Sequence, residues 1–149
     1  MDRRSAVKSV LAAGTGMLAA GLVTQAEAME TPKVPRVVYH LSDLDKVNFV
    51  LGNLRNHIDG MGGADKVQLA VVVHGPPLGA FRATTGGDDV RDRLAGLVKE
   101  GVAFHACIHT MEGMKLTLAE LMPGFAVAEK GGVVKLAELQ GQGWLYLRP

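Results

Sequence analysis

The single cysteine of this 149-residue chain lies among polar side chains that could take part in chemistry. Cys107 ends an apolar run, and His105, His109 and Thr110 all lie within three residues of it. A lone cysteine forms no internal disulfide, so a functional Cys107 would act as a thiol, a persulfide carrier or a metal ligand. Alternatively, Cys107 is a small apolar side chain that fills space in a buried strand.

Two further histidines also follow apolar runs. His40 ends the run Val37-Val38-Tyr39, and His74 follows Val71-Val72-Val73 and precedes Gly75. In an open parallel sheet, ligands and reacting groups gather beyond the carboxyl ends of the strands. We therefore predict that His40, His74 and Cys107 share one pocket, with His105 close by. The alternative is that each histidine merely caps a strand by hydrogen bonding to a loop carbonyl.

The turns after these runs would complete such a pocket. Gly75 opens a loop rich in glycine and proline, and His109 and Thr110 open the turn or helix that follows Cys107. Backbone N–H groups at the start of a helix stabilise negative charge, so a thiolate would be favoured at Cys107.

The elements that must position these residues alternate along the chain. Apolar runs without alternation indicate buried strands, and apolar positions at helical spacing indicate helices, the first of which could be capped by Ser42 or Asp43. This order predicts one α/β domain, a three-layer α/β/α sandwich with a mostly parallel sheet of about five strands. The predicted strands are 34–41, 67–73, 102–107, 125–128 and 144–147, and the predicted helices are 43–60, 90–98, 116–121 and 133–140.

Residues 1–28 have the pattern of an export signal. Paired arginines, Arg3 and Arg4, precede an apolar run over 10–23 and then Ala26-Glu27-Ala28, which offers small residues to a signal peptidase. The arginine pair resembles a twin-arginine signal, and the run is too short and too rich in Gly and Ala for a stable membrane span. We predict a periplasmic mature domain over 29–149; the alternative is a disordered cytoplasmic N-terminus.

The mature domain is electrically neutral. Without Arg3, Arg4 and Lys8 it keeps 13 basic residues, and without Asp2 and Glu27 it keeps 13 acidic ones. A neutral chain with few aromatic residues does not suit nucleic-acid binding. Since an exported domain without a disulfide depends on its core and any subunit interface, we expect a homo-oligomer.

Several segments together resemble one known family. The chain is similar to the DsrE/DsrF-like family, and within it to the exported single-domain branch. That resemblance implies a three-layer α/β/α domain, assembly into trimers or hexamers, and a cysteine at Cys107 that carries sulfane sulfur in the sulfur-relay members. The relay members are cytoplasmic and work with partner subunits, whereas this chain carries the pattern of an export signal. The segments that carry the resemblance are 37–41, 51–57, 71–75, 101–111 and 139–149.

The leading hypothesis is a periplasmic protein that binds or transfers sulfane sulfur without a cofactor. Cys107 would be the nucleophile, and His105 or His74 would lower its pKa or move a proton. His40, Gly75, His109 and Thr110 would line the binding site, and the partner would be a small sulfur-containing ligand or an acceptor protein thiol.

Two hypotheses from other classes stay open. A soft-metal site for Cu(I), or a haem-binding module, could use Cys107 and its histidines with Met111 and Met114, although paired cysteines are absent from the sequence. The third is a non-catalytic oligomeric scaffold that binds a small ligand at a subunit interface.

Overall fold

The computed structural model describes residues 33–149, which form one parallel α/β sheet structure. Within this range five strands pair in the order β4-β3-β2-β1-β5, and every neighbouring pair is parallel. The predicted fold class is confirmed; the predicted export signal at 1–28 lies outside the described residues. The strands are β1 (Arg36–Leu41), β2 (Gln68–Val73), β3 (Ala103–Cys107), β4 (Phe125–Ala128) and β5 (Leu145–Leu147).

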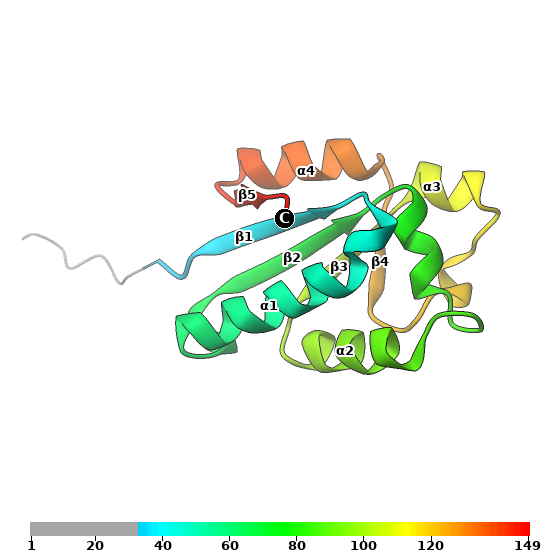
Figure 1. Ribbon diagram of the computed structural model, residues 1–149. Helices are drawn as coiled ribbons and strands as arrows, with labels where there is room; N and C mark the ends of the chain where they lie inside the picture. Colours follow the sequence, from blue (N-terminus) through cyan, green and yellow to red (C-terminus); the bar gives the residue numbers. More distant parts are fainter. Residues whose placement is uncertain (1–32) are drawn as a thin grey trace, which may run out of the picture. The chain divides into compact units, whose positions relative to one another are not determined.

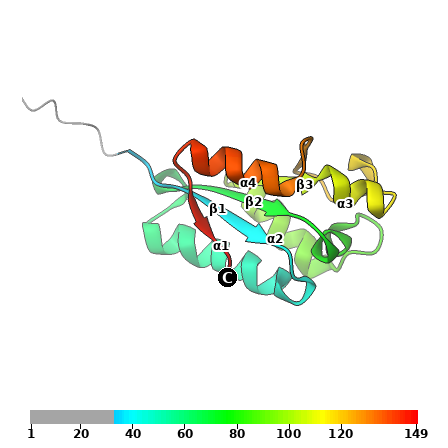
Figure 2. The same ribbon diagram turned by 90° about the horizontal axis from the view of Figure 1, so that it is seen from above.

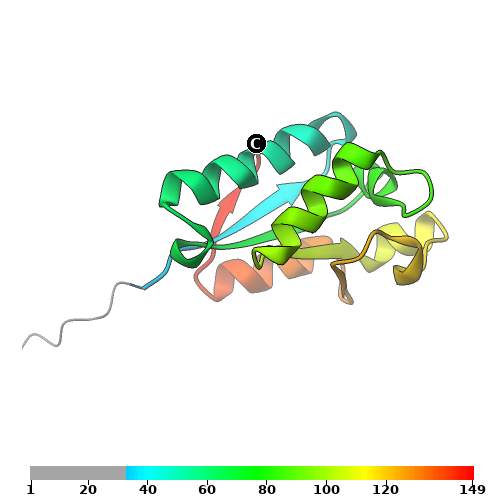
Figure 3. The ribbon, with the colours of Figure 1, turned by 90° about the horizontal axis from the view of Figure 1, so that it is seen from below.

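Helices cover both faces of the sheet. Helices α1 (Val47–Met61) and α2 (Asp88–Lys99) lie on one face, and α4 (Gly132–Gly141) lies on the other (Figures 1 and 2). The view from below places α1 and α2 in front of the strands (Figure 3). The short helix α3 (Ile108–Gly113) follows β3 directly at the carboxyl edge of the sheet. The 3-10 helices are η1 (Leu44–Lys46), η2 (Ala64–Lys66), η3 (Pro76–Phe81) and η4 (Leu118–Glu120).

The alternation of side chains along the strands divides the core in two. Val37, Tyr39 and Leu41 of β1 pack in the larger cluster, which also contains the buried faces of α1 and α2. Val38 and Val72 pack instead against Leu136 and Leu139 of α4. Because successive strand residues point to opposite faces, His40, His105 and Cys107 share the α4 face with Val38 and Val72.

One local prediction was wrong, and another was right only in part. The helix predicted over 116–121 is only the 3-10 turn η4, because Lys115 adopts a left-handed φ of 54° and separates this turn from α3. The predicted first helix does begin next to Asp43, which is the N-cap residue of η1, but η1 forms its first turn, Asp43 makes no side-chain cap hydrogen bond, and α1 begins at Val47. The carboxylate of Asp43 instead accepts a hydrogen bond from Arg148 at 3.1 Å.

Leu54 offers a test of the larger core, because its side chain is 0% exposed. We expect Leu54→Ala to lower the free energy of unfolding by about 2–5 kcal/mol, since truncation removes buried apolar area and leaves a cavity. Leu44→Ala is the matched control, because Leu44 is 55% exposed and should change stability by less than about 1 kcal/mol. Urea denaturation measures both, and equal losses would contradict the described core.

Candidate functional site

The carboxyl ends of three adjacent strands bring the candidate residues to one place. His40 of β1 pairs in register with Val72 of β2, and Val73 pairs with Ala106 of β3. The N–H of His74 then donates to the carbonyl of Leu41 at 3.1 Å, which continues the pairing past the end of β2. His40, His74 and Cys107 therefore stand side by side at the edge of the sheet, on the face that α4 covers.

Hydrogen-bond donors surround the Cys107 sulfur. The side chain is only 6% exposed, and this burial by itself raises the thiol pKa. Backbone N–H groups of Thr110, Gly132 and His109, together with the Thr110 hydroxyl, outweigh burial and lower the pKa of Cys107 below its usual value. Donors aimed at sulfur favour the charged thiolate over the neutral thiol.

The loop after β2 orients the Thr110 hydroxyl. The N–H of Gly75 donates to Thr110 Oγ1 at 2.8 Å. Because that oxygen already accepts from Gly75, its own proton is free to be donated to the Cys107 sulfur. Gly75 has a φ of 72°, a backbone conformation that favours glycine, so its residue type is part of this arrangement.

Two glycines let the start of α4 approach the thiol. A Cβ at Gly132 would lie 3.1 Å from Cβ of His74 and 3.3 Å from Cβ of Cys107. A Cβ at Gly131, whose φ is 95°, would lie 2.8 Å from Cδ2 of His109. The sequence analysis missed both residues, although a Gly-Gly pair between a strand and a helix is a signal of close backbone approach.

A hollow of about 270 Å³ opens beside Cys107. Val133 and Val134 form an apolar rim, with Val133 70% exposed. Two polar side chains at the hollow have acidic partners: Lys130 Nζ lies 2.8 Å from a Glu138 carboxylate oxygen, and His109 Nδ1 lies 3.5 Å from one of Glu112. The hollow is lined by His74, Cys107, His109, Thr110, Lys130, Gly131, Gly132, Val133 and Val134.

His40 and His74 are in direct contact. Nε2 of His40 lies 3.1 Å from Nδ1 of His74, and Nδ1 of His40 lies 2.7 Å from the Tyr146 hydroxyl. Burial, followed by His74 and Arg148, lowers the pKa of His40 to about 4 against a smaller opposing effect of Asp43. Burial and then Arg148 also lower the pKa of His74. Both imidazoles are therefore neutral at pH 7.

His105 takes a different position from the other candidates. It shares a strand face with Cys107 and pairs in register with Val72 and Ala126, but it lies outside the set of described residues that line the hollow. Burial, followed by the nearby charge of Lys135, lowers the pKa of His105. Of the two histidines predicted to assist Cys107, His74 is the one that reaches the hollow.

The predicted metal ligands are the next candidates to place in the structure. Within residues 33–149, no group of three or more His, Cys, Asp and Glu side chains is arranged to hold one. Met111 is buried in the larger core, and Met114 packs against that core.

None of the helices within residues 33–149 is long and apolar enough to cross a membrane.

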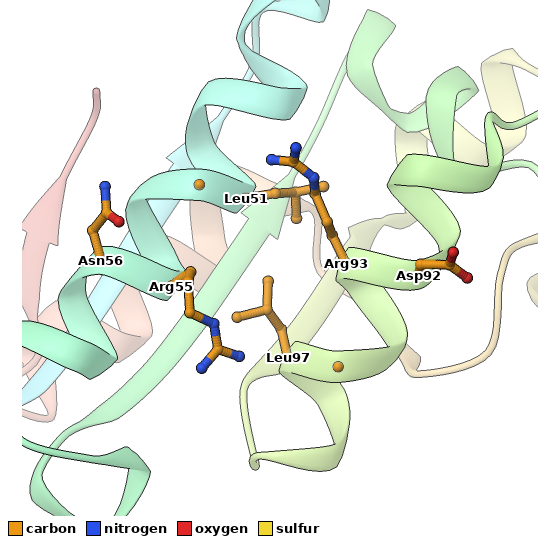
Figure 4. Close-up of a pocket in the computed structure, with 8 residues that line it drawn as sticks. Leu51, Arg55, Asn56, Asp92, Arg93 and Leu97 are labelled. Atoms are coloured by element: carbon orange, nitrogen blue, oxygen red, sulfur yellow. The ribbon is translucent and has the colours of Figure 1, made fainter.

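A larger groove of about 560 Å³ runs between α1 and α2, on the opposite face of the sheet. Leu51 and Leu97 lie between the two helices, with Arg55 and Arg93 beside them (Figure 4). Arg55 is paired with Glu100 and Arg93 with Asp89. None of the described residues that line this groove is a cysteine or histidine, so the reactive side chains lie at the smaller hollow.

Comparison with known proteins adds evidence about the fold. No protein-family model matches the chain, and no curated protein was found similar to it. Among solved structures, the protein of unknown function MTH1491 from Methanobacterium thermoautotrophicum is 26% identical with a TM-score of 0.68, over 77% of this chain and 99% of that one.

Two further solved structures are more distant in sequence. The conserved protein of unknown function BT1422 from Bacteroides thetaiotaomicron is 15% identical with a TM-score of 0.59, over 76% of this chain and 94% of that one. The ychN protein from E. coli is 13% identical with a TM-score of 0.57, over 77% of this chain and 99% of that one. Together with the all-parallel five-stranded sheet of residues 33–149, these similarities show that the domain has the DsrE-like fold.

Proposed function

We propose that this protein is a carrier of sulfane sulfur, with Cys107 holding the sulfur as a persulfide. The observation that carries the proposal is a cysteine that lines an open hollow beside Thr110 and Gly132, whose N–H and hydroxyl groups lower the pKa of its thiol. Sulfur transfer needs a nucleophilic thiolate, and these donors lower the pKa of Cys107.

Loading would begin from the Cys107 thiolate. Its sulfur attacks the terminal sulfur of a persulfide or polysulfide donor, forms a new S–S bond, and releases the donor's remaining thiolate. No electrons are gained or lost overall, because one S–S bond forms as another breaks. The apolar rim of Val133 and Val134 is suited to the uncharged part of such a donor or to the surface around an acceptor thiol.

In the release step, the Cys107 sulfur would be the leaving group instead of the nucleophile. An acceptor thiol attacks the terminal sulfur, the S–S bond at Cys107 breaks, and its electron pair stays on the Cys107 sulfur. The same N–H and hydroxyl donors that activate the thiolate stabilise it as a leaving group. His74 lines the hollow as a neutral imidazole, so it is the candidate base for the acceptor thiol's proton.

The proposal also covers where the protein works and with what. We propose that the domain acts in the periplasm after export, as a homotrimer or homohexamer. For the alternative of a soft-metal site, residues 33–149 contain no group of three or more His, Cys, Asp and Glu side chains arranged around one ion.

Intact mass spectrometry tests the carrier directly. After incubation with polysulfide, we expect the wild type to gain the mass of sulfur atoms and to lose it on treatment with a reductant. Cys107→Ser should gain none, while keeping its fold because Ser nearly matches the size of Cys. A native mass spectrum after copper addition separates the alternatives: copper retained by wild type that takes up no sulfur would contradict the sulfur carrier.

Thr110 tests the donor set around the thiol. Thr110→Val removes the hydroxyl donor but keeps the backbone N–H, so the pKa of Cys107 should rise. The rate of reaction with iodoacetamide is measured from about pH 6 to about pH 10, and the midpoint of its rise with pH should move to higher pH. Thr85→Val, in an exposed loop, is the matched control. Superimposable profiles for the two variants would show that the hydroxyl does not act on the thiol.

Gly132 tests the close approach of α4. A Cβ there must displace His74 or Cys107, so Gly132→Ala should slow sulfur loading at least several-fold. Gly141→Ala, at the other end of the same helix, meets no atom within 4 Å and should load at the wild-type rate. Loading rates from quenched mass spectra measure the effect, and unchanged loading by Gly132→Ala would argue against the site as described.

A further inference from the structure

We propose that His74, His40 and Tyr146 form a proton relay between the hollow beside Cys107 and solvent at the edge strand β5. This inference rests on the proposed sulfur-carrier function and assigns a role to two residues, His40 and Tyr146, that do not line the hollow. His74 lines the hollow, His40 lies 3.1 Å behind it, and the Tyr146 hydroxyl lies 2.7 Å beyond His40. Tyr146 is 39% exposed, so the outer end of the relay is open to solvent.

The three side chains come from separate strands that the sheet places together. His40 ends β1, which lies between β2 and β5 in the sheet order. Tyr146 of β5 pairs in register with Val38, two residues before His40 on the same strand face. The ion pair of Arg148 with Asp43 joins the end of β5 to the loop after β1 and holds the two ends together.

The contacts allow two arrangements of protons that differ by one shift along the row. In the first, Nδ1–H of His74 donates to Nε2 of His40, and Nδ1–H of His40 donates to the Tyr146 oxygen. In the second, Tyr146 donates to Nδ1 of His40, and Nε2–H of His40 donates to Nδ1 of His74. A proton that enters at the other nitrogen of His74, Nε2, converts the first arrangement into the second while Tyr146 releases its own proton to water.

This shift carries the proton that the acceptor thiol loses in the release step of sulfur transfer. An acceptor thiol gives its proton to Nε2 of His74 as its sulfur attacks the terminal sulfur on Cys107. The bond between that sulfur and Cys107 breaks, and the electron pair stays on Cys107 as the thiolate. The products are the acceptor persulfide, the Cys107 thiolate and one proton delivered to solvent by Tyr146. The first arrangement returns for the next cycle when Nε2 of His74 gives its proton to water in the open hollow, while a proton from solvent enters the row at Tyr146.

The charges around His40 and His74 do not hold a proton on either imidazole. Asp43 and Arg148 face both imidazoles, and across the hollow Lys130 and His109 have their own carboxylate partners. Lys135 acts on His105 and lies outside the row. With the pKa of His40 lowered to about 4, an imidazolium there is short-lived at neutral pH and gives its proton onward.

The experiment measures the rate at which persulfide-loaded protein passes sulfur to a small thiol at about neutral pH. The rate is measured once in dilute buffer and once with added imidazole. Wild type should transfer at a rate that hardly depends on imidazole. Tyr146→Phe and His40→Gln should be slower by roughly 10-fold or more in dilute buffer, and imidazole should restore much of the rate. Sulfur loading and thiol alkylation should stay near wild type, because neither needs the relay.

The chain supplies a matched control in its other tyrosine–histidine pair. The Tyr39 hydroxyl lies 2.8 Å from Nδ1 of His57 in the α1 layer, so Tyr39→Phe removes a similar contact away from the site and should transfer at the wild-type rate. If Tyr146→Phe fails to fold, His40→Gln decides the outcome. Wild-type transfer by folded variants, or slow transfer that imidazole does not restore, would overturn the relay alone. Failure of wild type to load sulfur would overturn the proposed function and the relay with it.

Discussion

The site depends on a balance between burial of the Cys107 sulfur and the hydrogen-bond donors around it. Burial removes water from the sulfur and disfavours the thiolate, and only fixed N–H and O–H groups restore what water would supply. The donors come from residues 109–110 after β3 and from Gly132 at the start of α4, and Gly75 after β2 sets the hydroxyl's direction. The parallel sheet is what makes this convergence possible, because it brings every one of these turns to the same edge.

The same balance explains why glycines stand where they do. Gly132 places a backbone N–H against Cys107 where any side chain would meet His74 and the cysteine. Gly75 adopts a left-handed φ and thereby directs its N–H to Thr110. Glycine loses more conformational freedom on folding than other residues, so both positions lower the stability of the fold slightly. They also allow the backbone to approach the surroundings of the thiol. Residue type is constrained at Gly132 by the close approach to His74 and Cys107, and at Gly75 by its positive φ.

Local sequence pattern predicted the sheet well because buried parallel strands are short, continuous apolar runs. The strand over 125–128 was predicted with its true bounds, and the strand-end rule correctly placed His40, His74 and Cys107 at one edge. The turn or helix predicted to open at His109 and Thr110 is the helix α3, but its bounds were not predicted because six residues are too few to show a helical period. Contacts such as His40 with Tyr146 or Arg148 with Asp43 join residues more than 100 positions apart, and no local pattern reveals them.

The two faces of the sheet divide stability from chemistry. The α1 and α2 face holds the larger core, which includes Phe81, Phe104 and Phe125 in mutual contact. The groove between these two helices is also larger in volume than the hollow beside Cys107. The α4 face holds only a small apolar cluster, and beyond it the sheet edge carries the histidine pair and the thiol. A face that contributes little to the core is where close glycine contacts and half-buried neutral histidines cost the fold least. Cavity volume alone therefore does not single out the hollow beside Cys107, whereas the N–H and hydroxyl groups that lower the thiol pKa do.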